Sequence, residues 1–185
     1  MKHQLPGLFL WGFAFQLLFL SCKKEMIIVP ETETISATQK VTEGGNWLPF
    51  KGSYPTTREI LSPPPLLQAR ITGIGQASHL GQSKFIIQST INFTTPPPFQ
   101  LTGASTFYAA NGDTFYTVFT GTSTPLADGT FLAIFNHTIT GGTGRFQNAS
   151  GSFTGRHIGH PVNPEGFTSI EGGTINYYVK APYKL

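Results

Sequence analysis

From Trp47 onward the chain alternates between strand-like runs and turn signals, and this pattern constrains its fold more than any other feature. The runs are rich in Phe, Ile and Thr, which suit the pleated surface of a sheet, and no segment after Cys22 has helical periodicity of useful length. We predict eight strands, at residues 47–54, 67–79, 84–94, 99–109, 114–123, 129–139, 145–158 and 167–180. The separators contain turn formers such as Pro-Pro-Pro, Asn-Gly and Asp-Gly.

Apolar and polar residues alternate most regularly in the third and sixth of these segments. The residues that share a face are Phe85, Ile87, Ile91 and Phe93 in the third and Phe131, Ala133, Phe135, His137 and Ile139 in the sixth. Successive antiparallel strands with short connections form a meander, and eight of them suggest a barrel or a sandwich. Glycines inside the strands, such as Gly73 and Gly103, permit the coiling that a small barrel needs. We therefore expect an all-β, eight-stranded antiparallel β-barrel.

The charge of the chain excludes one class of partner. Its 12 Lys and Arg against 9 Asp and Glu give a net charge of +3, and only 11% of residues are charged. The positive residues are scattered, apart from Lys23 and Lys24. Because no basic stripe is interleaved with aromatic residues, we expect no binding of nucleic acid.

The N-terminus has the organisation of a secretory signal. A short basic start, Met1 to His3, precedes an apolar run from Leu8 to Leu20, and Lys23 to Glu25 end the apolar character. The run is shorter than the about 20 residues that span a bilayer core. Export therefore fits this segment better than a transmembrane helix does.

The single cysteine indicates which kind of signal this is. Phe19-Leu20-Ser21-Cys22 resembles a relaxed lipobox, with Phe19 in place of the usual Leu, at which signal peptidase II cuts before a lipid-modified cysteine. The alternatives are a chance cysteine in an ordinary signal peptide, or an uncleaved anchor. Several acyl chains, each buried methylene adding about 0.8 kcal/mol of membrane affinity, would make the anchoring effectively permanent.

These features divide the chain into three parts. We expect a lipoprotein signal peptide at residues 1–21, lipidated Cys22 with a polar tether to residue 45, and a β-barrel domain at residues 46–181. The protein would be exported and anchored through palmitate-type chains in the bacterial cell envelope, at the outer membrane on its periplasmic or surface face. A lone cysteine excludes an intramolecular disulfide and any zinc site built on several cysteines.

One segment resembles a known group of barrels. Gly141 to Phe146, with the sequence GGTGRF, and the following Ala149 and Gly151 resemble a segment of dirigent proteins and of the allene oxide cyclase-like barrel families. Gly75 to Gly81 looks like a segment in uncharacterised bacterial members of that group, and the resemblance extends over about Trp47 to Val179. It implies an eight-stranded antiparallel barrel with an elongated lumen.

The resemblance implies less about activity. Plant members of these families cyclise a fatty-acid epoxide or steer radical coupling. Their cavity residues do not map onto this chain, so no catalytic residue is carried over, and a shared fold does not imply a shared function. The glycine-rich segment itself lacks the Lys-Ser/Thr and the helix of a phosphate-binding loop. We interpret it as a turn between the sixth and seventh strands, with Arg145 paired to a carboxylate or capping the turn.

Few residues of the domain are suited to acid–base catalysis. Asp113, Asp128 and Glu165 lie in predicted turns, whose residue preferences explain them, and only Glu171 lies well inside a strand. A glycosidase with paired carboxylates is therefore not expected. No Gly-x-Ser-x-Gly nucleophile elbow is present either.

The histidines are the remaining candidates. His79 ends the second predicted strand, and His157 and His160 end the seventh without a carboxylate or cysteine beside them, so we expect no metal site. His137 shares a face with Phe131 and Phe135. If that face lines the lumen, His137 is either a hydrogen-bonded core histidine or a polar contact for a ligand.

The leading hypothesis is a lipid-anchored, non-enzymatic barrel that binds a small apolar or amphipathic molecule or an envelope partner, without a cofactor. The candidate ligand-binding residues are His137, His79, Phe131, Phe135 and Glu171. The alternatives are an isomerase or cyclase that uses the lumen, and a structural envelope protein. An eight-stranded barrel can also be filled entirely by its own side chains, which would exclude both a ligand and a substrate.

Overall fold

The computed structural model describes residues 47–178. The predicted signal peptide, the tether and Cys22 therefore lie outside the described residues, as does the predicted end of the domain at residue 181. The described residues contain no helix that is long and apolar enough to cross a bilayer.

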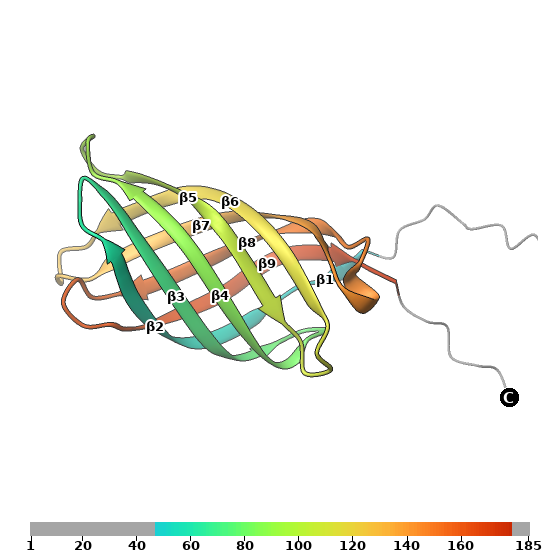
Figure 1. The fold of residues 1–185 in the computed structure, drawn as a ribbon. Coiled ribbons are helices and arrows are strands. Elements are labelled where there is room, and N and C mark those ends of the chain that lie inside the picture. The colour runs from blue at the N-terminus through green and yellow to red at the C-terminus, as the bar shows by residue number, and fades with distance from the viewer. Residues whose placement is uncertain (1–46, 179–185) are drawn as a thin grey trace, which may run out of the picture. The chain divides into compact units, whose positions relative to one another are not determined.

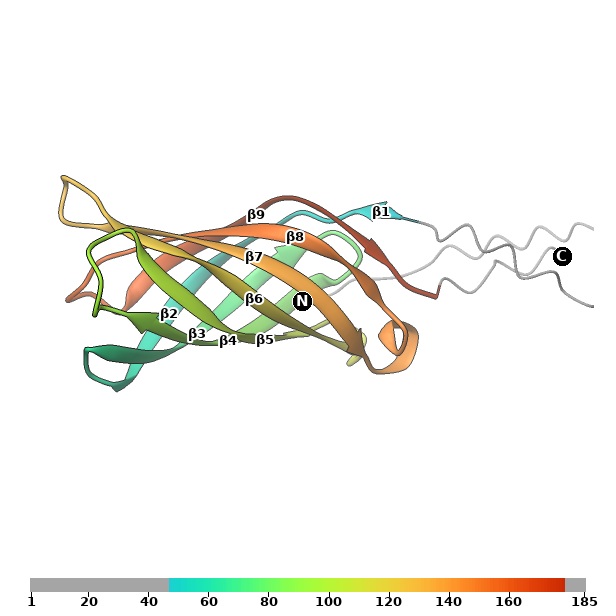
Figure 2. The same cartoon turned by 90° about the horizontal axis from the view of Figure 1, so that it is seen from above.

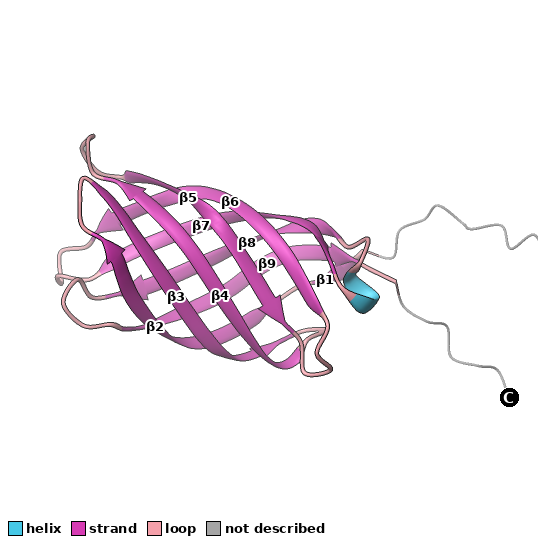
Figure 3. Cartoon of the chain, in the orientation of Figure 1, coloured by secondary structure: helices cyan, strands magenta, loops and turns pink. Residues whose placement is uncertain are grey.

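The described residues form nine antiparallel strands and one short 3-10 helix, coloured by type in Figure 3. They are β1 (Leu48–Pro49), β2 (Gly52–Ser62), β3 (Leu66–Ala77), β4 (Gly81–Asn92), β5 (Phe99–Tyr108), β6 (Thr114–Pro125), β7 (Phe131–Gly142), η1 (Gly144–Phe146), β8 (Ser150–Gly159) and β9 (Glu165–Asn176). Each of β2 to β8 pairs with the next strand, and β9 pairs with both β8 and β2. The sheet is thereby closed into an eight-stranded antiparallel barrel, as predicted, and β1 is an extra strand on β9 (Figure 1).

Residues of alternate parity point into the barrel, as the period of two requires. On β7, Ala133, Phe135, His137 and Ile139 are buried, so the face predicted from the sequence is the inner one. On β4, Phe85 and Ile87 are fully buried, whereas Phe93 lies just beyond the strand's last residue.

Two predicted strands differ most from the observed ones. The first was expected to end at residue 54, but β2 runs through Pro55 to Ser62 and is paired on both sides, with β3 and β9. The seventh was expected to begin at residue 145, but β8 begins at Ser150. Arg145 and Phe146 belong instead to η1, where the fully buried ring of Phe146 packs edge-on against Phe115.

One half of the interior is filled by aromatic rings. Phe107 stacks on Phe115 with centroids 4.7 Å apart, and Phe50 meets Phe153 edge-on at 5.0 Å. Such pairs contribute about 0.5–1.5 kcal/mol each beyond their burial. The first and last described residues leave the barrel at this packed end, where β1 lies beside the end of β9 (Figures 1 and 2).

Candidate functional site

The other half of the barrel holds a cavity of about 310 Å³. It lies at the end formed by the β2–β3, β4–β5, β6–β7 and β8–β9 connections, opposite the packed aromatic end (Figure 1). Its apolar lining includes Ile71, Ile91, Phe99, Leu101, Phe131 and Phe135. A volume of this size is at the lower limit of the about 300–1,000 Å³ that is usual for small-molecule sites.

The cavity exists because small residues point inward at this level of the barrel. Ala69 is paired with Ser89 across β3 and β4, and Ser123 with Ala133 across β6 and β7. All four are buried and line the cavity. The corresponding inward positions at the other end hold phenylalanines, which fill the lumen there. The difference in side-chain volume therefore leaves one end of the barrel hollow.

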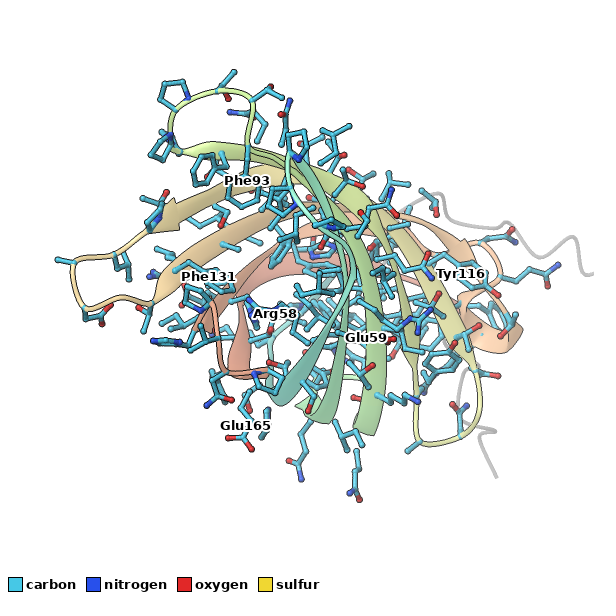
Figure 4. The ribbon with its side chains drawn as sticks, turned by 60° about the vertical axis from the view of Figure 1, so that its left-hand side comes forward. Arg58, Glu59, Phe93, Tyr116, Phe131 and Glu165 are labelled. Carbon is cyan, nitrogen blue, oxygen red and sulfur yellow. The ribbon has the colours of Figure 1, made fainter. Side chains whose placement is uncertain are left out.

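Arg58 is the charged residue of the cavity wall. It points inward from β2, and its guanidinium lies over the ring of Phe131, with Cζ 5.2 Å from the centroid (Figure 4). Its Nη2 donates to the backbone oxygens of His160 and Pro161, at 2.9 and 2.7 Å. Its Nε is buried and has no hydrogen-bond partner. Burial lowers the pKa of Arg58 from its usual value.

His157 is the second ionisable side chain of the cavity wall. Its Nδ1 forms a 2.9 Å hydrogen bond with Oγ1 of Thr168, and both side chains are buried. Burial, and after it the positive charge of Arg58, lower the pKa of His157 to about 4. The imidazole is therefore neutral at neutral pH. A neutral ring beside Arg58 leaves the positive charge of the guanidinium uncompensated.

His137 lies deeper than the cavity, beyond Phe135 toward the packed end, and is not part of its lining. Its Nδ1 forms a 2.9 Å hydrogen bond with Oγ1 of Thr117, and its ring stacks on Phe153 at 4.4 Å. Burial lowers the pKa of His137 to about 3. Of the two interpretations of this residue, the structure supports a hydrogen-bonded core histidine.

The structure brings two of the five candidate binding residues to the cavity, Phe131 and Phe135. His79 lies at the opposite end, in the β3–β4 turn, with Nε2 3.0 Å from the backbone oxygen of Pro49. Glu171 is on the outer surface of β9, 3.5 Å from Arg156, because its neighbour Ile170 takes the inward position. Neither His79 nor Glu171 lines the cavity.

Sequence reasoning missed Arg58 altogether and treated His157 only as an improbable metal ligand. The signal for His157 was its parity with Phe153, which places both residues on one face of β8. Arg58 gave no such signal, since it lies in a segment that was not predicted as a strand.

The glycine-rich segment connects β7 to β8, as interpreted from the sequence. Gly144 has a positive φ of 53°, and Arg145 Nε lies 3.8 Å from a carboxylate oxygen of Asp113. Arg145 also donates through Nη2 to the backbone oxygen of His79, at 2.6 Å. The segment is therefore a turn that links strand connections at the packed end through Arg145, far from the cavity.

In residues 47–178, no three His, Cys, Asp or Glu side chains come together in a way that could hold a metal ion. Comparison with known proteins adds no relative: no protein family, no curated protein and no solved structure matches the chain. The resemblance to dirigent and allene oxide cyclase-like barrels therefore stays a prediction.

Proposed function

We propose that this chain is a lipid-anchored, non-enzymatic barrel of the cell envelope that binds a small apolar or amphipathic molecule in its cavity. The observation that carries the proposal is the apolar cavity of about 310 Å³ at the loop end. Filling it would remove from water both the ligand and the surrounding Ile, Leu and Phe surface, at about 25 cal/mol per Å².

The ionisable groups at the cavity favour binding over catalysis. Among the described residues that line it, Arg58 and His157 carry such groups, and no carboxylate does. A general base works best when its pKa is near the working pH. His157, with a pKa of about 4, is a weak base, and Arg58 keeps its proton.

The position of the cavity suits an anchored protein. Both ends of the described chain lie at the packed end of the barrel (Figure 1), and the cavity is lined by residues at the other end. A tether that joins the barrel at Trp47 would attach it at the end opposite to the loops around the cavity. A ligand can then exchange with a partner or with the surrounding solution.

Mass spectrometry of organic extracts from the purified protein tests this proposal. We expect one class of small amphiphile to co-purify with the wild type in a fixed ratio. Ala133→Phe, which places a ring in the cavity, should abolish co-purification, whereas Ala104→Phe, on the exposed face of β5, should not. Equal amounts of extracted material from both variants would show that it is bound elsewhere.

A further inference from the structure

Arg58 differs from the other arginines of the chain in having no ionic partner. Arg70, Arg145 and Arg156 lie 2.9, 3.8 and 3.5 Å from a carboxylate oxygen of Glu59, Asp113 and Glu171, respectively. Arg58 points into the barrel and forms no ion pair within the described residues. Its neighbour Glu59 points outward to Arg70 (Figure 4).

The polar contacts of Arg58 use only part of its donor set. Both of its described hydrogen bonds come from Nη2, and they end on backbone oxygens of the β8–β9 connection. These uncharged acceptors hold the guanidinium at the cavity wall without neutralising it. The buried Nε has no acceptor. A partly buried cation with unused donors costs free energy unless another group pairs with it.

The surroundings of Arg58 place this cation beside an apolar volume. Phe131 lies under the guanidinium, and Ile60 and Ile71 line the cavity next to it. His157, the other ionisable group of the lining, is neutral at neutral pH and supplies no negative charge. Residues 47–178 therefore supply no negative charge to Arg58, and a bound ligand can supply one.

We propose that the ligand is an amphiphile with a carboxylate headgroup, whose head pairs with Arg58 and whose apolar chain fills the space between Leu101 and Phe135. This inference rests on the proposed function, and it names the chemical class of the ligand. A carboxylate provides both the negative charge and the acceptors that Arg58 lacks, and guanidinium–carboxylate hydrogen bonds are among the strongest in proteins. The size of the cavity favours a medium-length chain over a long one.

Ligands of equal chain length and different headgroup provide the test. Decanoate, decanol and decylamine would compete with a neutral naphthylamine fluorophore for the mature chain from residue 22 carrying Cys22→Ser, which lacks both the apolar run and the acylation site and so avoids detergent. At neutral pH we expect decanoate to bind about tenfold more tightly than decanol, and the decylammonium ion more weakly than both. This comparison of three affinities is made without any substitution at Arg58.

Variants then assign the preference to one residue. Arg58→Met, which keeps an apolar stem, should lower the ratio of decanoate to decanol affinity by about tenfold and leave decanol affinity similar. Arg58→Lys should retain part of the ratio. The matched control, Arg156→Met, removes the same charge from the outer face of β8 and should leave the ratio unchanged.

Each result decides between the two proposals. Equal binding of decanoate and decanol to the wild type, or an unchanged ratio in a folded Arg58→Met protein, would overturn the carboxylate assignment and leave the cavity's function intact. If none of the three compounds displaced the fluorophore, both proposals would fail. If Arg58→Met does not fold, the three wild-type affinities still test the carboxylate assignment. Only a positively charged site binds decanoate more tightly than decanol and decanol more tightly than the decylammonium ion.

Discussion

Nδ1 of His137 lies 2.9 Å from Oγ1 of Thr117, and both side chains are buried inside the barrel. This hydrogen bond gives Nδ1 a partner, although the imidazole lies among phenylalanine rings and stacks on Phe153. His137 lies outside the cavity, whose lining on β7 ends at Phe135. The two buried histidines therefore have different surroundings: His137 belongs to the packed core, and His157 to the cavity wall.

His137→Phe should destabilise the fold and leave ligand binding nearly unchanged. The substitution keeps the ring stacked on Phe153 but leaves the Thr117 hydroxyl buried without its partner, at a cost of about 1–3 kcal/mol. Chemical denaturation gives the stability, and fluorophore affinity gives the binding. A variant of normal stability that lost affinity would contradict the assignment of His137 to the core.

The two buried histidines predict that the barrel loses stability in mild acid. Burial lowers the pKa of His137 to about 3 and that of His157 to about 4, below the value of about 6.5 for an unfolded chain. At a pH between the folded and the unfolded pKa of a ring, the unfolded state binds more protons than the folded state does. The free energy of unfolding therefore falls as the pH falls, by up to about 1.4 kcal/mol per pH unit for each ring.

Denaturation curves at about pH 7.5, 6 and 5 measure this slope. His137→Phe removes one of the two groups and should make the slope shallower. An unfolding free energy that stayed constant over this range in the wild type would show that the rings are not buried in the neutral form.

Gly144→Ala should destabilise the packed end more than a second glycine substitution does. Gly144 has a positive φ, and a Cβ there would meet the carboxylate of Asp113, which pairs with Arg145. Gly112 also has a positive φ, but a Cβ there would meet nothing within 4 Å. We expect about 1 kcal/mol of destabilisation for Gly112→Ala from backbone strain, and about 2 kcal/mol or more for Gly144→Ala.

Thermal or chemical denaturation of the two variants provides the comparison. Equal costs would mean that Asp113 moves away freely, and that the pairing of Asp113 with Arg145 does not hold the turn.

The barrel could be predicted from the sequence because buried and exposed residues alternate along most of its strands with a period of two. Phe131, Phe135 and His137 share a parity that the register of β7 confirms. The β2 strand was half missed because Pro55 lacks a backbone donor and is normally a sign of an edge or a break. In addition, Arg58 occupies an inward position where an apolar residue is expected.

The cavity could not be predicted, since it depends on pairing between strands. Ala69 and Ser89 are 20 positions apart in the chain and become neighbours only through the register of β3 and β4. A small residue in one strand leaves no space if a large one faces it from the next. Only the closed barrel shows that these small residues meet at one level, and that Arg58 and His157 lie beside the resulting space.

The proposed anchor lies outside the described residues and has its own test. Cys22→Ser should abolish labelling by a radioactive or clickable fatty acid. When a signal peptide that is cleaved without lipidation also replaces residues 1–21, the variant should leave the membrane fraction, because the acyl chains supply nearly all of the anchoring energy. Continued labelling would show that Cys22 is not the acylated residue, and unchanged fractionation would show that another surface holds the membrane.

Fluorescence titration with the neutral naphthylamine probe shows whether the cavity is a binding site. For the wild type we expect saturable enhancement with one probe bound per barrel, and for Ala104→Phe the same curve. Ala133→Phe should lose the enhancement while keeping the circular dichroism spectrum of the folded barrel, because its added ring occupies the space between the apolar walls. No saturable signal in the wild type, or an identical titration of a folded Ala133→Phe protein, would mean that the cavity does not bind the probe.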